Sequence, residues 1–161
     1  MNVDVILEAF NRRQVDAILI GGMNFLLRHQ GQLTYDVDFW VNDTHENLEK
    51  VSQALADLRA EWGRDEASWK PTPAGSEWLK AQTMFCLTSR EGAIDIFREV
   101  EGLEGQFEAC RSRAAVLRSA GGQTYVSLSD TDMLACQMAL PESSRRADRI
   151  AFLRNLAKDK S

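Results

Sequence analysis

The sequence has little cysteine and no apolar run long enough to cross a membrane. Its three cysteines, Cys86, Cys110 and Cys136, are far apart and form no CxxC pair, which argues against a disulfide framework or a structural zinc site. Apolar runs such as 17–20 and 25–27 are far shorter than the ~18 residues of a membrane span. The N-terminal segment carries acids instead of a basic leader. We therefore expect a cytoplasmic protein that does not enter a membrane.

Excess positive charge is also missing. The 161 residues include 24 acidic and 19 basic side chains, for a formal charge of −5 at pH 7, which argues against a general nucleic-acid coat but not against a local basic groove. The two histidines, His29 and His45, have no cysteine or histidine partner at metal spacing. Neither a GxSxG elbow nor a GxxxxGK phosphate loop is present. Esterase and P-loop chemistry therefore have no motif to support them.

The apolar pattern that remains predicts a mixed α/β (α+β) fold. The whole chain, 1–161, is expected to form one domain, with C-terminal helices from about residue 131. A long loop is expected over 63–82, of a length that is often functional or mobile. Helices are expected over 3–13, 23–29, 46–62, 107–113, 131–140 and 144–158, and strands over 15–20, 35–41, 83–89, 93–97, 115–117 and 125–128.

Two carboxylates in the second predicted strand carry the main chemical signal. Asp36 and Asp38 alternate with Val37 and Phe39, so both acids point to one face of the strand. Neighbouring carboxylates repel each other, and a bound cation offsets that repulsion. Hard oxygen ligands of this kind favour Mg²⁺, or Mn²⁺, over zinc.

A glycine pair and a third acid complete the pattern. Gly21 and Gly22 follow a predicted strand and open a helix, where the backbone can approach a ligand closely and N–H groups favour a triphosphate. Asp95 stands between Ile94 and Ile96. If its strand pairs beside Asp36 and Asp38, three carboxylates converge into a site for two metals ~4 Å apart. Asp95 would then be the metal-linked base.

The order of three motifs resembles that of the nucleotidyltransferase superfamily related to DNA polymerase beta. These motifs are Ile20-Gly21-Gly22, Asp36-Val37-Asp38-Phe39 and Ile94-Asp95-Ile96. The likeness spans about 15–156. The Thr-x-Asp-x-Asp strand, 34–38, is similar to that of minimal bacterial nucleotidyltransferases, including the toxins of type IV toxin–antitoxin modules.

The resemblance implies a fold, a reaction and partners. The fold is a small mixed sheet with helices mainly on one face and an acidic site on the other. The reaction moves a nucleoside monophosphate from a nucleoside triphosphate (ATP is one) to a hydroxyl and releases pyrophosphate. Asp36, Asp38 and Asp95 bind metal, Gly21 and Gly22 hold phosphates, and Thr34 assists. The acceptor is an RNA end such as that of tRNA, a protein or a small molecule, and a cognate antitoxin is a further expected partner.

Two positions depart from that superfamily. Gln32 stands where many relatives have a basic residue, and Gln137 aligns with a lysine that helps to neutralise the triphosphate. A glutamine supplies a dipole and no charge. The positive charge missing at these two positions would then be supplied by one of five other residues: Lys80, Arg90, Arg98, Arg145 or Arg146. The alternative function is a catalytically weak or inactive nucleotide-binding module that acts through a protein partner.

Several residues have a structural interpretation beside the functional one. Thr34 either bonds its own backbone at the strand entry or contacts nucleotide. Asp130 and Asp132 are expected in the first turn of a helix capped by Ser129. The arginines 145, 146 and 149 either form a solvated helix face or contact RNA or triphosphate. The tryptophans 62, 69 and 78 either provide hydrophobic cover or stack on a base.

Overall fold

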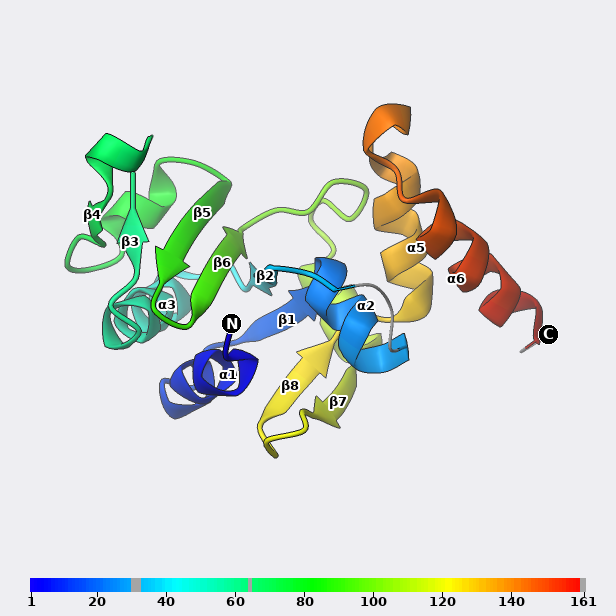
Figure 1. Cartoon of the computed structure of the whole chain (residues 1–161), viewed down its shortest axis with the longest axis horizontal. Helices are drawn as coiled ribbons and strands as arrows, with labels where there is room; N and C mark the ends of the chain where they lie inside the picture. Colours follow the sequence, from blue (N-terminus) through cyan, green and yellow to red (C-terminus); the bar gives the residue numbers. More distant parts are fainter. Residues whose placement is uncertain (30–32, 64, 160–161) are drawn as a thin grey trace.

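The computed structural model describes residues 1–29, 33–63 and 65–159, and these form a mixed α/β fold as expected (Figure 1). Within the described chain, no helix is long and apolar enough to cross a membrane. In the described part of the chain, six α-helices pack around a sheet of eight strands. The helices are α1 (Val3–Arg12), α2 (Gly21–His29), α3 (His45–Asp57), α4 (Phe107–Arg113), α5 (Asp130–Ala139) and α6 (Ala147–Asp159). The strands are β1 (Ala17–Ile20), β2 (Asp36–Val41), β3 (Glu61–Trp62), β4 (Lys70–Pro71), β5 (Met84–Ser89), β6 (Gly92–Phe97), β7 (Ala115–Arg118) and β8 (Thr124–Ser127).

The two strands that carry the acids lie side by side in the middle of the sheet. The strand order is β4-β3-β5-β6-β2-β1-β8-β7. Strand β2 pairs in parallel with β6 and antiparallel with β1, and β5 pairs antiparallel with β6. The chain turns from β1 directly into α2 at Gly21. This topology brings the start of α2 next to the central strands.

Apolar residues on the two faces of the sheet form two separate cores. Val37 and Ile94 point to the face covered by α1 and α3, where Leu48 and Leu55 are fully buried. The opposite face bears the acids. Ile18 and Trp40 lie farther along it and pack with residues of α4, α5 and α6. The acid-bearing face is therefore covered by helices at one end and open at the other.

The chain between α3 and β5 differs from the expectation. The predicted helix 46–62 ends at Asp57, because Arg59 takes a positive φ of 52° and turns the chain. Strand β3 then pairs with β5, and β4 pairs with β3 and forms the edge of the sheet. These two-residue strands were not predicted.

The segment 63–82 is anchored at its C-terminal end. Leu79 lies in a short 3-10 helix (Glu77–Lys80) and is fully buried. Trp78 packs against Trp62 and Phe85 at ring-centroid distances of 5.7 and 5.0 Å. The packing role of Trp62 and Trp78 is thus confirmed.

The first turn of α5 has the expected structural acids. The Ser129 side chain accepts a hydrogen bond from the Asp132 N–H and caps the helix. Asp132 is buried and forms a two-point ion pair with Arg113, while Asp130 bonds Arg28. These two carboxylates therefore serve the fold.

Candidate active site

Three carboxylates converge on the open part of the sheet face. In the parallel pairing of β2 with β6, Asp38 lies directly opposite Asp95, and Asp36 lies opposite Ala93. Adjacent strands are about 4.8 Å apart, so side chains at paired positions on one face meet. One oxygen from each of Asp36, Asp38 and Asp95 lies within 4.8 Å of the others. The spacing suits a shared cation with oxygen ligands.

The electrostatics of this cluster favour a bound positive charge. Asp38 is the most buried of the three acids, and burial, with the charges of Asp36 and Asp95, raises its pKa from 3.8 to about 7. Burial also raises the pKa of Asp95, with a contribution from Asp36. Both shifts arise because the ionised forms lose water and repel one another. A cation at the cluster would remove this penalty.

Two groups hold the carboxylates in place. The Thr34 hydroxyl donates a hydrogen bond of 2.5 Å to Asp36 Oδ1, so it orients one of the three acids. The Cys86 thiol, opposite Asp95 on β5, donates to the Asp95 carboxylate. Sequence reasoning missed Cys86, although strict alternation along β5 places it on the acid face.

The glycine pair lies against the acids because no side chain could fit there. A Cβ on Gly21 would lie 1.9 Å from Asp38 Oδ2, and its φ of +64° favours glycine. A Cβ on Gly22 would lie 2.7 Å from Thr34 Oγ1. The Gly22 N–H donates to the Asp38 carboxylate. The first turn of α2 therefore touches the acid cluster directly.

A basic residue from α6 also reaches this point. Nη2 of Arg149 lies 3.2 Å from the position that a Gly22 Cβ would take. Its guanidinium lies 5.4 Å from the centre of the Phe25 ring and interacts with the charges of Asp38 and Asp36. Burial and the charge of Arg146 lower its pKa, and it stays protonated because arginine titrates so high. The sequence signal was the arginine cluster 145–149, which does not reveal which member faces the site.

The other basic residues that could replace the missing positive charge make contacts elsewhere or lie in other parts of the chain. Lys80 pairs with Glu77, Arg98 pairs with Asp43, and Arg146 lies 3.8 Å from Asp148. The Arg145 guanidinium donates to the carbonyls of Leu140 and Met138. Arg90 lies in the turn between β5 and β6. Gln32 lies outside the described residues.

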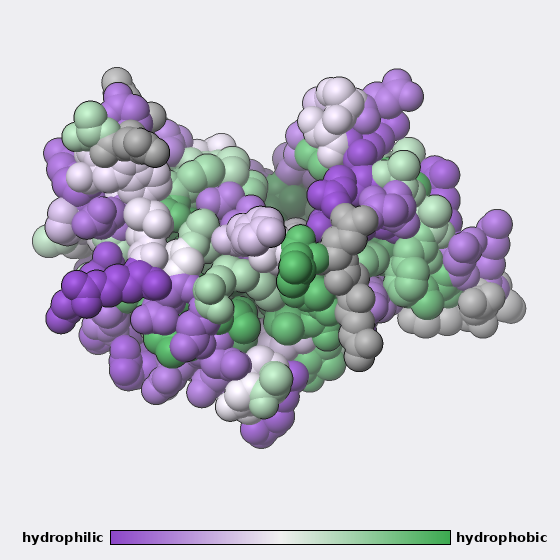
Figure 2. Space-filling view, in the orientation of Figure 1, coloured by the Kyte–Doolittle hydropathy of each residue, from purple (hydrophilic) through white to green (hydrophobic). Residues whose placement is uncertain are grey.

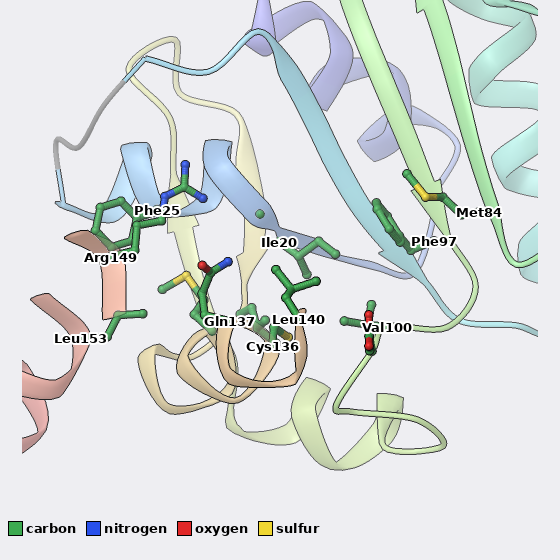
Figure 3. Close-up of a pocket in the computed structure, with 14 residues that line it drawn as sticks. Ile20, Phe25, Met84, Phe97, Val100, Cys136, Gln137, Leu140, Arg149 and Leu153 are labelled. Carbon is green, nitrogen blue, oxygen red and sulfur yellow. The ribbon is translucent and has the colours of Figure 1, made fainter. Parts of the chain in front are cut away.

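An apolar pocket of about 390 Å³ adjoins the cluster. Gly21 and Ile20 line it from the junction of β1 and α2, and Met84 and Phe97 from β5 and β6 (Figure 3). Figure 2 shows the molecule hollowed between the β5–β6 side and the α5–α6 pair, with hydrophobic residues at the bottom of the hollow. Its polar side chains come from Glu101, Gln137 and Arg149. Its volume lies in the range of small-molecule sites.

Comparisons with known proteins identify the fold. The structure superposes on a protein from Thermotoga maritima, provisionally classed as a nucleotidyltransferase, with a TM-score of 0.55 and 11% identity over 96% of this chain and 89% of that one. It also superposes on the antibiotic-resistance factor ANT(2″)-Ia, a nucleotidyltransferase, with a TM-score of 0.56 and 11% identity over 99% of this chain and 82% of that one. The chain therefore has a nucleotidyltransferase-like fold. No protein-family model and no curated protein matches the sequence.

Proposed function

We propose that this chain is a metal-dependent nucleotidyltransferase that moves a nucleoside monophosphate from a nucleoside triphosphate to a hydroxyl acceptor. The observation that carries the proposal is the convergence of Asp36, Asp38 and Asp95 within 4.8 Å, beside the first turn of α2. A nucleotidyltransferase-like fold supports it independently.

The donor set fits Mg²⁺, with Mn²⁺ as the alternative. All three groups are carboxylates, and hard oxygen ligands suit these ions. Burial and the charges of Asp36 and Asp95 raise the pKa of Asp38, and a bound cation would offset this cost of ionising the cluster. A divalent ion bound there supplies charge neutralisation for the carboxylates and the phosphate oxygens.

The chain's own residues then have distinct roles. Backbone N–H groups in the first turn of α2, opened by Gly21 and Gly22, bind phosphate oxygens. Asp95 accepts the proton of the acceptor hydroxyl as its oxygen attacks the α-phosphorus. The bond from that phosphorus to the bridging oxygen of the β-phosphate breaks, and pyrophosphate leaves with the electron pair. Thr34 keeps Asp36 in position through its hydrogen bond.

The apolar pocket fits the nucleoside part of the donor. It begins at Gly21, where the phosphates are proposed to lie, and most of its lining is hydrophobic. A nucleobase offers flat apolar faces with polar edges, and Glu101 and Gln137 are placed among the polar groups of the pocket.

Transfer of a labelled α-phosphate tests the proposal. The purified protein is incubated with each α-labelled nucleoside triphosphate, Mg²⁺ and cell RNA, cell protein or small hydroxyl compounds in turn. We expect label in one acceptor class, and a loss of about 10²- to 10⁴-fold in Asp95→Asn. Asp57→Asn, which removes a carboxylate paired with Arg13 instead, is the matched control and retains transfer.

A catalytically weak nucleotide-binding module is the second candidate. Gln137 favours it, because an amide replaces the expected lysine in a residue that lines the pocket. Nucleotide binding without label transfer to any acceptor would support this candidate over the enzyme.

We further propose that the protein acts as a toxin. This part of the proposal depends on the similarity of residues 34–38 to the toxins of type IV toxin–antitoxin modules. It predicts that expression of the wild type arrests growth in a bacterial host, whereas Asp38→Ala does not. The RNA and protein arms of the labelling experiment then identify the target. Growth that is equal for both forms would remove the toxin role and leave the enzyme proposal intact.

A further inference from the structure

We infer, on the proposed function above, that Arg149 is the cation that binds the phosphates of the nucleoside triphosphate, in place of the lysine absent at Gln137. The charge that this chain supplies to the leaving pyrophosphate would then come from α6 instead of α5.

The placement of Arg149 suits a phosphate at the start of α2. Its Nη2 and Thr34 Oγ1 lie 3.2 and 2.7 Å from the same point, the position of a Cβ on Gly22. An anion at the first turn of α2 would meet backbone N–H groups and this guanidinium together. A planar fork of donors is well suited to two phosphate oxygens.

The guanidinium is held at this place but has no ion-pair partner among the residues that the structure describes. It lies over the Phe25 ring at 5.4 Å, a contact that fixes the plane of the fork. Its charged neighbours are Asp38, Asp36, Arg146 and Asp148. Asp38 and Asp36 attract it, and among the described residues it forms no ion pair with either acid, so its N–H donors can turn to a phosphate. Figure 3 shows Arg149 beside Phe25 at one end of the pocket.

Gln137 has a structural role at the junction of α5 and α6, and that role does not require a positive charge. Its Oε1 accepts a hydrogen bond of 2.9 Å from the Arg146 backbone N–H, directly before α6 begins at Ala147. Arg145 adds two bonds to the end of α5. These contacts fix the start of α6 against α5, and Arg149 lies in the first turn that they position.

Two neighbouring arginines, one just before α6 and one within it, provide a comparison. Arg146 ion-pairs with Asp148 outside the cluster. Arg154 is exposed and reaches the Met138 sulfur at 3.5 Å. Arg154→Gln is therefore a matched control: it removes the same charge from the same helix, away from the acids.

Calorimetric titration in Mg²⁺ tests the inference on the wild type, Arg149→Gln, Arg149→Lys and Arg154→Gln. The probes are inorganic triphosphate, each nucleoside triphosphate and the matching monophosphate. We expect Arg149→Gln to weaken both triphosphate probes about ten- to a hundredfold, the range for hydrogen bonds to a charged group, and the monophosphate less. Arg149→Lys should recover part of the loss, because it keeps the charge and loses the fork. Thermal unfolding of each variant shows that it is folded.

The outcomes separate this inference from the proposed function. Equal triphosphate binding by the wild type and Arg149→Gln overturns the role of Arg149 and leaves the function standing. An equal loss for monophosphate and triphosphate also overturns it, because the residue would then serve the nucleoside or the fold. Arg149-dependent binding of triphosphate, with no label transfer to any acceptor, supports Arg149 and defeats the enzyme. A wild type that binds neither triphosphate probe overturns both.

Discussion

At the scale of single residues, the site is governed by repulsion among three acids. Asp38 carries most of the penalty, because it is both the most buried and flanked by the other two carboxylates. Thr34 and Cys86 hold Asp36 and Asp95 by hydrogen bonds. Hydrogen bonds of this kind orient acids without neutralising them. In the proposed metal site, the repulsion among the acids is thus a cost to the stability of the metal-free protein.

That cost predicts an unusual pH dependence for metal-free protein. The folded protein keeps the Asp38 proton up to about pH 7, whereas the unfolded chain releases it near the ordinary pKa of 3.8. The contribution of this group to the free energy of unfolding therefore falls as the pH rises from about 4 to about 7, and is constant above that. Asp38→Asn should lack this decline. Urea unfolding in a chelator, at about pH 5 and about pH 8, measures the difference.

Asp57→Asn is the control for that experiment. The pKa of Asp57 is lowered by Arg13, in the opposite direction to that of Asp38, so this variant should keep the decline of the wild type. If the wild type and Asp38→Asn lose stability in parallel between the two pH values, the acids do not strain the fold as described.

At the scale of elements, α2 depends on the close approach of its first turn to β2. Gly21 has a φ of +64°, and a Cβ there would lie 1.9 Å from Asp38 Oδ2. Gly105 has a φ of +67° and nothing within 4 Å of its Cβ position. Gly21→Ala and Gly105→Ala thus share the backbone strain, about 1–2 kcal/mol, and differ in the collision. We expect only Gly21→Ala to weaken Mg²⁺ binding in calorimetry. Equal metal affinity in the two variants would show that close packing at Gly21 is unimportant.

The segment between β3 and β5 offers a second test at this scale. Leu79 is fully buried, and its neighbour Lys80 is exposed. Leu79→Ala should lower the free energy of unfolding by roughly 2–5 kcal/mol, and Lys80→Ala should change it by less than about 0.5 kcal/mol. Urea titration of both variants measures this. A loss below about 1 kcal/mol for Leu79→Ala would mean that the segment is weakly attached.

The sequence predicted most elements, because their periodicity is local. Alternation around Asp36 and Asp38 identified β2 and its polar face, and Ile94-Asp95-Ile96 identified β6. It could not predict β3 or β4, because two-residue strands have no period and exist only by pairing with β5 and each other. Helix α3 ends before the predicted residue 62 because of the left-handed backbone at Arg59. No local sequence pattern predicts that conformation.

At the scale of the whole molecule, residues distant in the chain meet at one place. The register of β2 with β6 brings Asp95 to Asp38 across more than fifty residues of chain, and the Gly21–Asp38–Asp95 motif order made that convergence predictable. Arg149 arrives from α6, whose position depends on its packing with α5 and on Gln137. Its place at Gly22 follows from tertiary packing alone, so the sequence could not single it out among its neighbours.

The most direct test of the account is a calorimetric titration of each nucleoside triphosphate into the wild type and Asp38→Ala, with and without Mg²⁺. We predict binding by the wild type that requires the metal and is lost in Asp38→Ala, because the triphosphate and the acids share the cation. Binding of no triphosphate, or Mg²⁺-independent binding that Asp38→Ala retains, would contradict the assignment of this acidic cluster as a nucleotidyltransferase site.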